Sequence, residues 1–280
     1  MNRILAPLRS LALPLLSTGA AALLASSCTQ PPVSCNLSAA MPYTGKYQLA
    51  SGAGSGPCSE LSGDALGLAA YNSMKPEGAP DLSQVSMAVR TTFLGSLVAH
   101  AAEYGIGDET DGHDPHAFGA FENGLPDENG ICRPAELSQA LQEIPLVPAD
   151  EGDPADPEDD IPEQPATSVT ETWSNVEVYV TAANPGTQMR GHYAVAQDGC
   201  SAEYDVLAVF PQVYCGDEDV LPDEDEDDDN EPNNDFCNAE PHPQLGYGSG
   251  ISPDYLVVCD PVMLFCVLDA APGGDFPVLR

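Results

Sequence analysis

The stretch SNVEVYVTA, Ser174–Ala182, decides the fold of this chain. Its three valines, Val176, Val178 and Val180, alternate with polar or amphipathic neighbours. This two-residue period is typical of a β-strand that buries one face and exposes the other. The turn signal NPG at 184–186 follows and indicates that the chain reverses into a neighbouring strand. The stretch therefore predicts an antiparallel sheet.

Further strand signals lie on both sides of this stretch. The expected strands are Tyr43–Ala50, Leu61–Tyr71, Val85–Thr92, Phe118–Glu122, Ile131–Arg133, a strand marked by Tyr193 and Val195, Tyr204–Phe210, Tyr255–Val258 and Val262–Leu268. The last two are almost continuous apolar runs, which predicts central positions in a sheet.

Two segments carry helical signals instead. Phe93, Leu97 and Ala101 share one helical face, which predicts a helix over Phe93–Tyr104. A second short helix is expected over Pro134–Ile144, because proline suits the first position of a helix. Together the signals predict a mainly β fold with one or two short helices, built as an antiparallel sandwich or barrel-like sheet and rich in disulfides.

The N-terminus carries the pattern of a bacterial lipoprotein signal peptide. Arg3 and Arg9 precede an Ala- and Leu-rich stretch, Leu11–Leu24, and LASSC at 24–28 puts small residues directly before Cys28. This arrangement predicts export, cleavage before Cys28 and lipid attachment to its thiol. The apolar stretch is shorter than the roughly 20 residues that a membrane helix needs. An uncleaved anchor and an ordinary secretory signal with an incidental cysteine are the alternatives.

Cysteine parity agrees with lipid attachment, because the chain has nine cysteines, an odd number. Using Cys28 for lipid leaves an even set, which predicts up to four disulfides in an exported chain. The remaining eight are Cys35, Cys58, Cys132, Cys200, Cys215, Cys237, Cys259 and Cys266. They contain no C-x2-C pair, which argues against a zinc–thiolate site, and their pairing stays open.

Composition divides the chain into five segments. These are a signal peptide at 1–27, a tether at 28–42, a first β/α half at 43–147, an acidic Pro-rich linker at 148–168 and a second β half at 169–280. Three of the eight cysteines precede the linker and five follow it. Complete pairing therefore requires at least one disulfide across the linker, which would clasp the two halves together.

The charge balance excludes one class of partner. Eight basic residues stand against 44 acidic ones, a formal net charge of −36. Such a field repels nucleic acid, and no basic stripe offsets it. The acids gather at 150–160 and 223–229, and runs of like charge are typical of solvated segments. A low-affinity reservoir for divalent cations is the functional alternative for these runs.

Three residues form a partial calcium-ligand pattern. Asp127, Asn129 and Glu136 fall at positions three, five and twelve of a calcium loop when Gly130 occupies position six. Oxygen ligands at alternate positions around a glycine turn are what calcium requires. Position one is Leu125, so no metal ligand is assigned, and a plain turn between two strands is the alternative.

Other patterns suggest chemistry but lack its motifs. Asp108–His116 holds two histidines among carboxylates without an HExxH motif, and a solvated loop is the alternative. The stretches 52–56 and 246–250 do not fit G-x-S-x-G, because their serine stands in fourth place. Trp173, the single tryptophan, is expected in the core rather than in a ligand platform. No catalytic residue is assigned, and the chain is not expected to be an enzyme.

The lipobox, the short tether, the acid-rich and Lys-poor chain and the several cysteines together resemble uncharacterised outer-membrane lipoproteins of myxobacterial type. Only about 30 N-terminal residues carry a specific motif, and the resemblance brings no known activity. It implies a lipid-anchored location at the outer membrane or cell surface. Thr29 agrees with this location, because aspartate at that position favours inner-membrane retention in enteric lipoproteins.

The expected role is binding or structural, with an envelope protein or a glycan as partner and the membrane held through the N-terminal lipid. No resident cofactor is expected, although calcium is a candidate. A calcium-stabilised adhesion module and an exported hydrolase with an unfamiliar site are the alternative functions.

Overall fold

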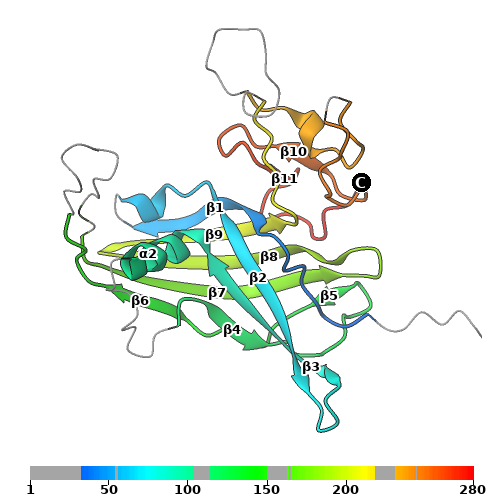
Figure 1. Cartoon of the computed structure of the whole chain (residues 1–280), viewed down its shortest axis with the longest axis horizontal. Coiled ribbons are helices and arrows are strands. Elements are labelled where there is room, and N and C mark those ends of the chain that lie inside the picture. Colours follow the sequence, from blue (N-terminus) through cyan, green and yellow to red (C-terminus); the bar gives the residue numbers. More distant parts are fainter. Residues whose placement is uncertain are drawn as a thin grey trace, which may run out of the picture. The chain divides into compact units, whose positions relative to one another are not determined.

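One antiparallel sheet of nine strands dominates the computed structural model of the chain (Figure 1). The strands follow the order β4-β3-β2-β1-β9-β8-β7-β5, and β6 also pairs with β7. Their bounds are β1 Tyr43–Ala53, β2 Gly63–Met74, β3 Pro80–Thr91, β4 Ala117–Ala120, β5 Ile131–Cys132, β6 Ala140–Ile144, β7 Thr167–Val180, β8 Pro185–Gln197 and β9 Cys200–Val209. The sheet curls into a half-barrel, which confirms the mainly β, barrel-like prediction.

The structure describes residues 33–53, 56–103, 114–149, 163, 165–217, 231–243 and 245–280. Cys28 and the acidic runs at 150–160 and 223–229 lie outside these described residues. Within the described residues, no helix is both long and apolar enough to cross a membrane.

The sheet takes its strands from both sides of segment 148–168. β1 pairs with β9, with Gly45 opposite Ala208. β1 also pairs with β2 along its other edge. At the β4 end the sheet meets the segment that follows β5, where the backbone N–H of Ser138 donates to the carbonyl of Phe118 over 2.8 Å. Strands from the two halves of the sequence therefore enclose one core.

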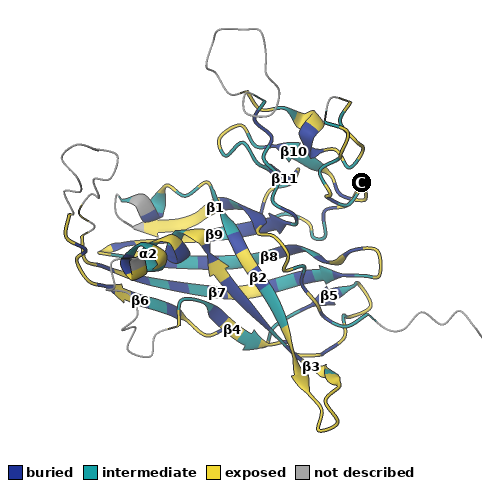
Figure 2. Cartoon of the chain, viewed as in Figure 1, coloured by how far each residue is buried: buried dark blue, intermediate teal, exposed yellow. Residues whose placement is uncertain are grey.

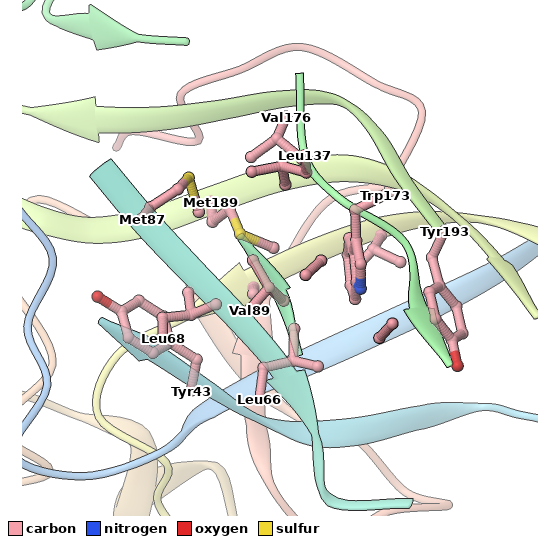
Figure 3. Packing of buried hydrophobic residues seen from close by; sticks show 14 of the residues in the cluster. Tyr43, Leu66, Leu68, Met87, Val89, Leu137, Trp173, Val176, Met189 and Tyr193 are labelled. Atoms are coloured by element: carbon pink, nitrogen blue, oxygen red, sulfur yellow. The ribbon is translucent and has the colours of Figure 1, made fainter. Parts of the chain in front are cut away.

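Large apolar side chains fill the inner face of the half-barrel (Figure 3), and the strands that carry them contain buried residues along their length (Figure 2). The rings of Trp173 and Tyr193 lie 4.8 Å apart, and those of Tyr47 and Tyr193 lie 5.4 Å apart. Trp173 is only 2% exposed, so its predicted place in the core is confirmed. Offset aromatic pairs of this kind stabilise a core beyond the area that they bury.

A β-bulge keeps the apolar residues of β7 on the inner face. The register between β7 and β8 shifts between Ser174 and Glu177, and Asn175 adopts a positive φ of 51°. Trp173 before the bulge and Val176 after it are both buried, although they are three positions apart and a regular strand would point them to opposite faces. Without the extra residue, the valines at the end of β7 would turn toward solvent.

One of the two predicted helices is present. α2, Thr92–Glu103, confirms the helix expected over Phe93–Tyr104. The helix expected over Pro134–Ile144 is wrong. Pro134 forms an isolated bridge with Phe121, and β6 continues the segment as a strand paired with β7. The buried residues of β6 alternate with more exposed ones, so the strand period overrides the local preference of proline.

The described residues after β9 form a C-terminal module with its own small core. It contains the 3-10 helix η3, Asn234–Cys237, and a two-stranded ribbon of β10, Val257–Cys259, and β11, Cys266–Leu268. Leu207 and Val209 belong to the same core, so the module packs on the outer face of β9. The side-chain amide of Gln188 in β8 exchanges hydrogen bonds of 2.9 and 3.0 Å with the backbone of Val278.

The central position expected for Tyr255–Val258 and Val262–Leu268 is wrong, because both segments lie in this module. The second run is also shorter as a strand than expected. Val262 is 76% exposed in a turn, and Leu264 has a positive φ of 54°. A continuous apolar run can line a turn against a small core as well as a central strand, and periodicity alone does not separate the two.

Four disulfides join the eight cysteines of the described chain. They are Cys35–Cys132, Cys58–Cys200, Cys215–Cys259 and Cys237–Cys266. Cys58–Cys200 connects the two sides of segment 148–168, and the last two lie within the C-terminal module.

Candidate functional site

A polar cleft opens on the outer face of β7, β8 and β9, beside the loop at 272–273. Its volume is about 510 Å³, and charged side chains dominate its walls. Glu177 stands directly after the β7 bulge, Arg190 and His192 follow on β8, and Asp205 stands on β9. Bulges often redirect side chains near functional sites, and this one brings Glu177 into the row of outward-facing polar residues.

Glu177 lies between two arginines, each bound to a different carboxylate oxygen. Nε of Arg133 donates to Oε1 over 2.7 Å, and Nε of Arg190 donates to Oε2 over 2.6 Å. Arg133 also donates to Asp127 over 2.8 Å, and Arg190 donates to the carbonyl of Gly274 over 3.0 Å. The network therefore links β7 and β8 to the turn before β5 and to the C-terminal module. Its charges are already paired within the chain.

The Arg133 guanidinium beside Asp127 holds the pKa of that carboxyl below its usual range. The same contact raises the pKa of Arg133. Both side chains are more than one-third exposed, so solvent screens this outer pair. The inner contacts to Glu177, whose side chain is 14% exposed, hold the network together more strongly.

Replacing Glu177 by glutamine is expected to lower the free energy of unfolding by about 1–2 kcal/mol. The two arginines would lose their shared anion, although solvent can partly replace it. Urea unfolding of the purified chain measures the change. Glu122→Gln, at an exposed glutamate on the same cleft, is the matched control and should stay within about 0.5 kcal/mol of the natural chain. Equal losses in both variants would contradict a special role for Glu177.

His192 faces two carboxylates of β9. Its Nδ1 lies 3.2 Å from Oδ1 of Asp205, and its Nε2 lies 3.5 Å from Oε2 of Glu203. The strand register places Ser174 opposite His192 on the other side, in β7. Within the described residues no hydrogen bond joins Ser174 to His192. Because both ring nitrogens face β9, this row does not form the serine–histidine relay of a hydrolase.

A second polar group lies inside the half-barrel, around Glu171 of β7. Oε1 of Glu171 accepts hydrogen bonds from the hydroxyls of Thr91, over 2.6 Å, and Tyr193, over 3.0 Å. Thr91 Oγ1 also accepts the backbone N–H of Leu94 over 3.1 Å, which caps the start of α2. The Glu171 carboxyl therefore connects β3, β7, β8 and the helix.

Burial raises the pKa of Glu171 to about 7, and the nearby Asp64 adds to this shift. The hydrogen bonds from Thr91 and Tyr193 act in the opposite direction. Glu171 is only 1% exposed, so solvent does little to stabilise its charged form. Close by in the same core, Tyr47 Oη and Trp173 Nε1 are buried without a hydrogen-bond partner among the described residues.

The partial calcium-loop pattern occupies a turn. Gly130 has a positive φ of 77°, and Asp127 Oδ1 accepts the N–H groups of Asn129 and Ile131 over 2.8 and 2.9 Å. The other oxygen of Asp127 binds Arg133, and Glu136 is exposed. The structure therefore places Asp127 and Asn129 in the turn before β5 and Glu136 after that strand, and the Asp127 carboxylate is bound by the protein itself.

The remaining candidates from the sequence either stabilise the fold or lie outside the described residues. Within the described chain, Cys215, Cys237 and Cys266 alone gather three metal-type ligand atoms, and all three are in disulfides. Ser249 donates to the carbonyl of Cys237 over 3.1 Å and so supports a loop. Ser55 and most of 108–116, through His113, lie outside the described residues.

Sequence reasoning missed both polar groups. A usable signal was present for Glu171, because it falls two residues before Trp173 on the face that β7 buries. The role of Glu177 depends on its ion pairs with Arg133 and Arg190. Local sequence patterns could not reveal these pairs, because both arginines are distant from Glu177 in the sequence. Their scarcity was the available signal: the chain has eight basic residues, and two of them meet here.

The curled antiparallel sheet, its polar outer cleft and its four disulfides define a disulfide-linked β half-barrel domain. A model of the MlpA family matches residues 41–211, and the chain belongs to this family. The match covers β1 to β9 and ends at Pro211, directly before the C-terminal module.

A relative described as "Putative lipoprotein MlpA", from Myxococcus xanthus, is 24% identical over 206 residues. These residues are 72% of this chain and 69% of the relative. The predicted resemblance to myxobacterial lipoproteins is thus confirmed at the level of the family. No solved structure matches the chain.

Proposed function

We propose that this chain is an exported lipoprotein, held to the cell envelope by lipid on Cys28, and that its β domain binds a partner. The observation that carries the proposal is the cysteine pairing. All eight cysteines after Cys28 are in disulfides, so Cys28 is the one cysteine left for lipid. Four disulfides also favour an oxidising compartment outside the cytosol. The printed description of the Myxococcus relative as a lipoprotein supports the same conclusion.

The outer membrane or cell surface is the proposed destination. Thr29 follows Cys28, and it lacks the negative charge that retains enteric lipoproteins in the inner membrane. The domain then faces an environment rich in proteins and glycans. A net charge of −36 keeps it away from anionic surfaces, so the lipid rather than the protein surface would hold it to the membrane.

A binding role is favoured over catalysis by the surroundings of His192. Its two nitrogens face Asp205 and Glu203, and Ser174 on the opposite side makes no hydrogen bond to it within the described residues. A hydrolase activity of the purified chain that His192→Gln abolishes would count against this proposal.

Cys28→Ser is expected to abolish lipid attachment and to release the protein from the membrane fraction. Growth with an alkyne-labelled fatty acid, followed by gel fluorescence and fractionation, measures both effects. The other eight cysteines should remain oxidised in the variant, as an alkylation assay without reductant would show. Thr29→Ser serves as the control and should keep both label and membrane location. A natural chain without label, or one with free thiols among the eight, would refute the proposal.

A further inference from the structure

A second cavity, of about 330 Å³, opens where the C-terminal module meets the end of the sheet. Three aromatic rings line it at different depths. Phe236 of η3 is buried, Tyr214 is half-buried, and Tyr247 is 65% exposed. Its volume lies in the range of small-molecule sites, which is about 300–1,000 Å³.

Asp235 is the carboxylate among the described residues that line this cavity, and His242 also lines it, with its ring 5.0 Å from that of Phe236. Asp235 is exposed beside Phe236, and its Oδ1 receives only a long contact of 3.4 Å from Asn238. The other oxygen of Asp235 makes no hydrogen bond within the described residues. No lysine or arginine is among the described residues that line the cavity. The described lining thus combines three aromatic side chains with the Asp235 carboxylate, in a chain whose net charge is −36.

Backbone hydrogen bonds hold the described residues on both sides of Tyr247 before any ligand arrives. The backbone N–H of His242 donates to the carbonyl of Tyr247 over 2.9 Å, and that of Ser249 donates to Asn238 over 2.9 Å. A Cβ on Gly248 would lie only 2.1 Å from the carbonyl oxygen of Ala239, so the loop packs closely against the module. The disulfide Cys237–Cys266 holds the adjoining end of η3. A backbone that is already held in place loses little conformational entropy when a ligand binds.

We propose that this cavity binds a small quaternary ammonium cation of the choline type. Aromatic faces attract such a cation through their quadrupoles, and Asp235 supplies a counter-charge. The negative field of the whole chain raises the local concentration of cations and repels anions. A purely apolar ligand would gain none of these three electrostatic attractions. It would also remove water from Asp235 without offering a compensating interaction. The proposal deepens the binding role argued above, and lipid attachment is tested independently of it.

The test compares choline with 3,3-dimethyl-1-butanol, which has the same shape but no charge. Ligand-observed NMR on the full chain, in a maltoside detergent free of choline groups, follows the nine equivalent methyl protons of either compound. Choline is expected to bind at least tenfold more tightly than the neutral compound, and more weakly as salt rises. Phosphocholine should bind more weakly than choline, because the acidic field opposes its phosphate.

Three variants localise the binding. Tyr247→Leu is expected to weaken choline binding at least tenfold, whereas Tyr247→Phe keeps the π face and should stay within twofold. Tyr71→Leu, at another exposed tyrosine that does not line this cavity, is the matched control. Unfolding midpoints equal to that of the natural chain would show that the variants fold.

Absence of choline binding, equal binding of choline and the neutral alcohol, or unchanged binding in Tyr247→Leu would each overturn the proposal. Tighter binding of phosphocholine than of choline would also overturn it, because the ligand would then be a zwitterionic headgroup. A chain that fails these tests but still carries lipid on Cys28 would leave the anchoring proposal standing.

Discussion

Removing the disulfide Cys58–Cys200 by a double substitution to alanine is expected to lower the free energy of unfolding by about 4–5 kcal/mol. The two cysteines are separated by 142 positions, the widest separation among the four bridges of the described chain. A cross-link that closes a long loop removes the most conformational entropy from the unfolded chain. Both cysteines are also buried, so their loss disturbs the packing around the end of β9.

Urea unfolding of the purified variants measures this effect. The control is the same double substitution at Cys237–Cys266, whose separation is 29. Its loss should be smaller by about 1.4 kcal/mol, since the closure entropy rises with the logarithm of loop length. A larger loss at the short loop than at the long one would contradict the argument. A steeper slope of unfolding free energy against urea in either variant would show that unfolding exposes more surface in that variant.

Glu171→Gln is expected to remove about 3 kcal/mol of pH dependence from the stability of the chain. Burial raises the pKa of Glu171 from 4.5 to about 7, so the folded chain keeps this proton at pH values where the unfolded chain has lost it. The stabilisation is therefore complete below about pH 4.5 and is lost as the pH rises through 7. Glutamine mimics the protonated side chain and has no such transition.

The difference in unfolding free energy between the natural chain and Glu171→Gln should therefore change by about 3 kcal/mol between pH 4 and pH 8, in favour of the variant at high pH. Urea unfolding at both pH values gives this difference and cancels the titration of the other acids. Glu143→Gln, at an exposed glutamate on β6, is the control and should show almost no change. A pH-independent difference for Glu171→Gln would refute the assignment of this titration to Glu171.

The sequence predicted the sheet well where one side of a strand was apolar. The valines of β7 and the alternation in β3 depend only on local period, and the structure confirms both strands. It failed at Pro134–Ile144, because a proline permits both a helix start and an isolated bridge. Pairing with β7 decides between these, and that contact is not local.

The candidate sites were less predictable for the same reason. Glu177 stands out only because it forms ion pairs with Arg133 and Arg190. The cavity near Tyr247 is lined by residues from segments far apart in the sequence, from Met41 to Ser249. Local spacing could identify Cys28 and the parity of the other cysteines. It could not show that Asp127 forms an ion pair with Arg133, because this contact depends on the conformation of the turn between them.

The pairing of β1 with β9 has a consequence for the order in which the chain acquires structure. One edge of β1 stays without its partner until residues near 200–209 have been synthesised, because β9 supplies that partner. Contacts between such distant segments make folding slow compared with that of helical proteins of similar stability. A ribosome-bound chain that has not reached β9 cannot close the half-barrel. Under the proposed export, the chain would enter the export channel before β1 has paired with β9, and the sheet would be completed after transport.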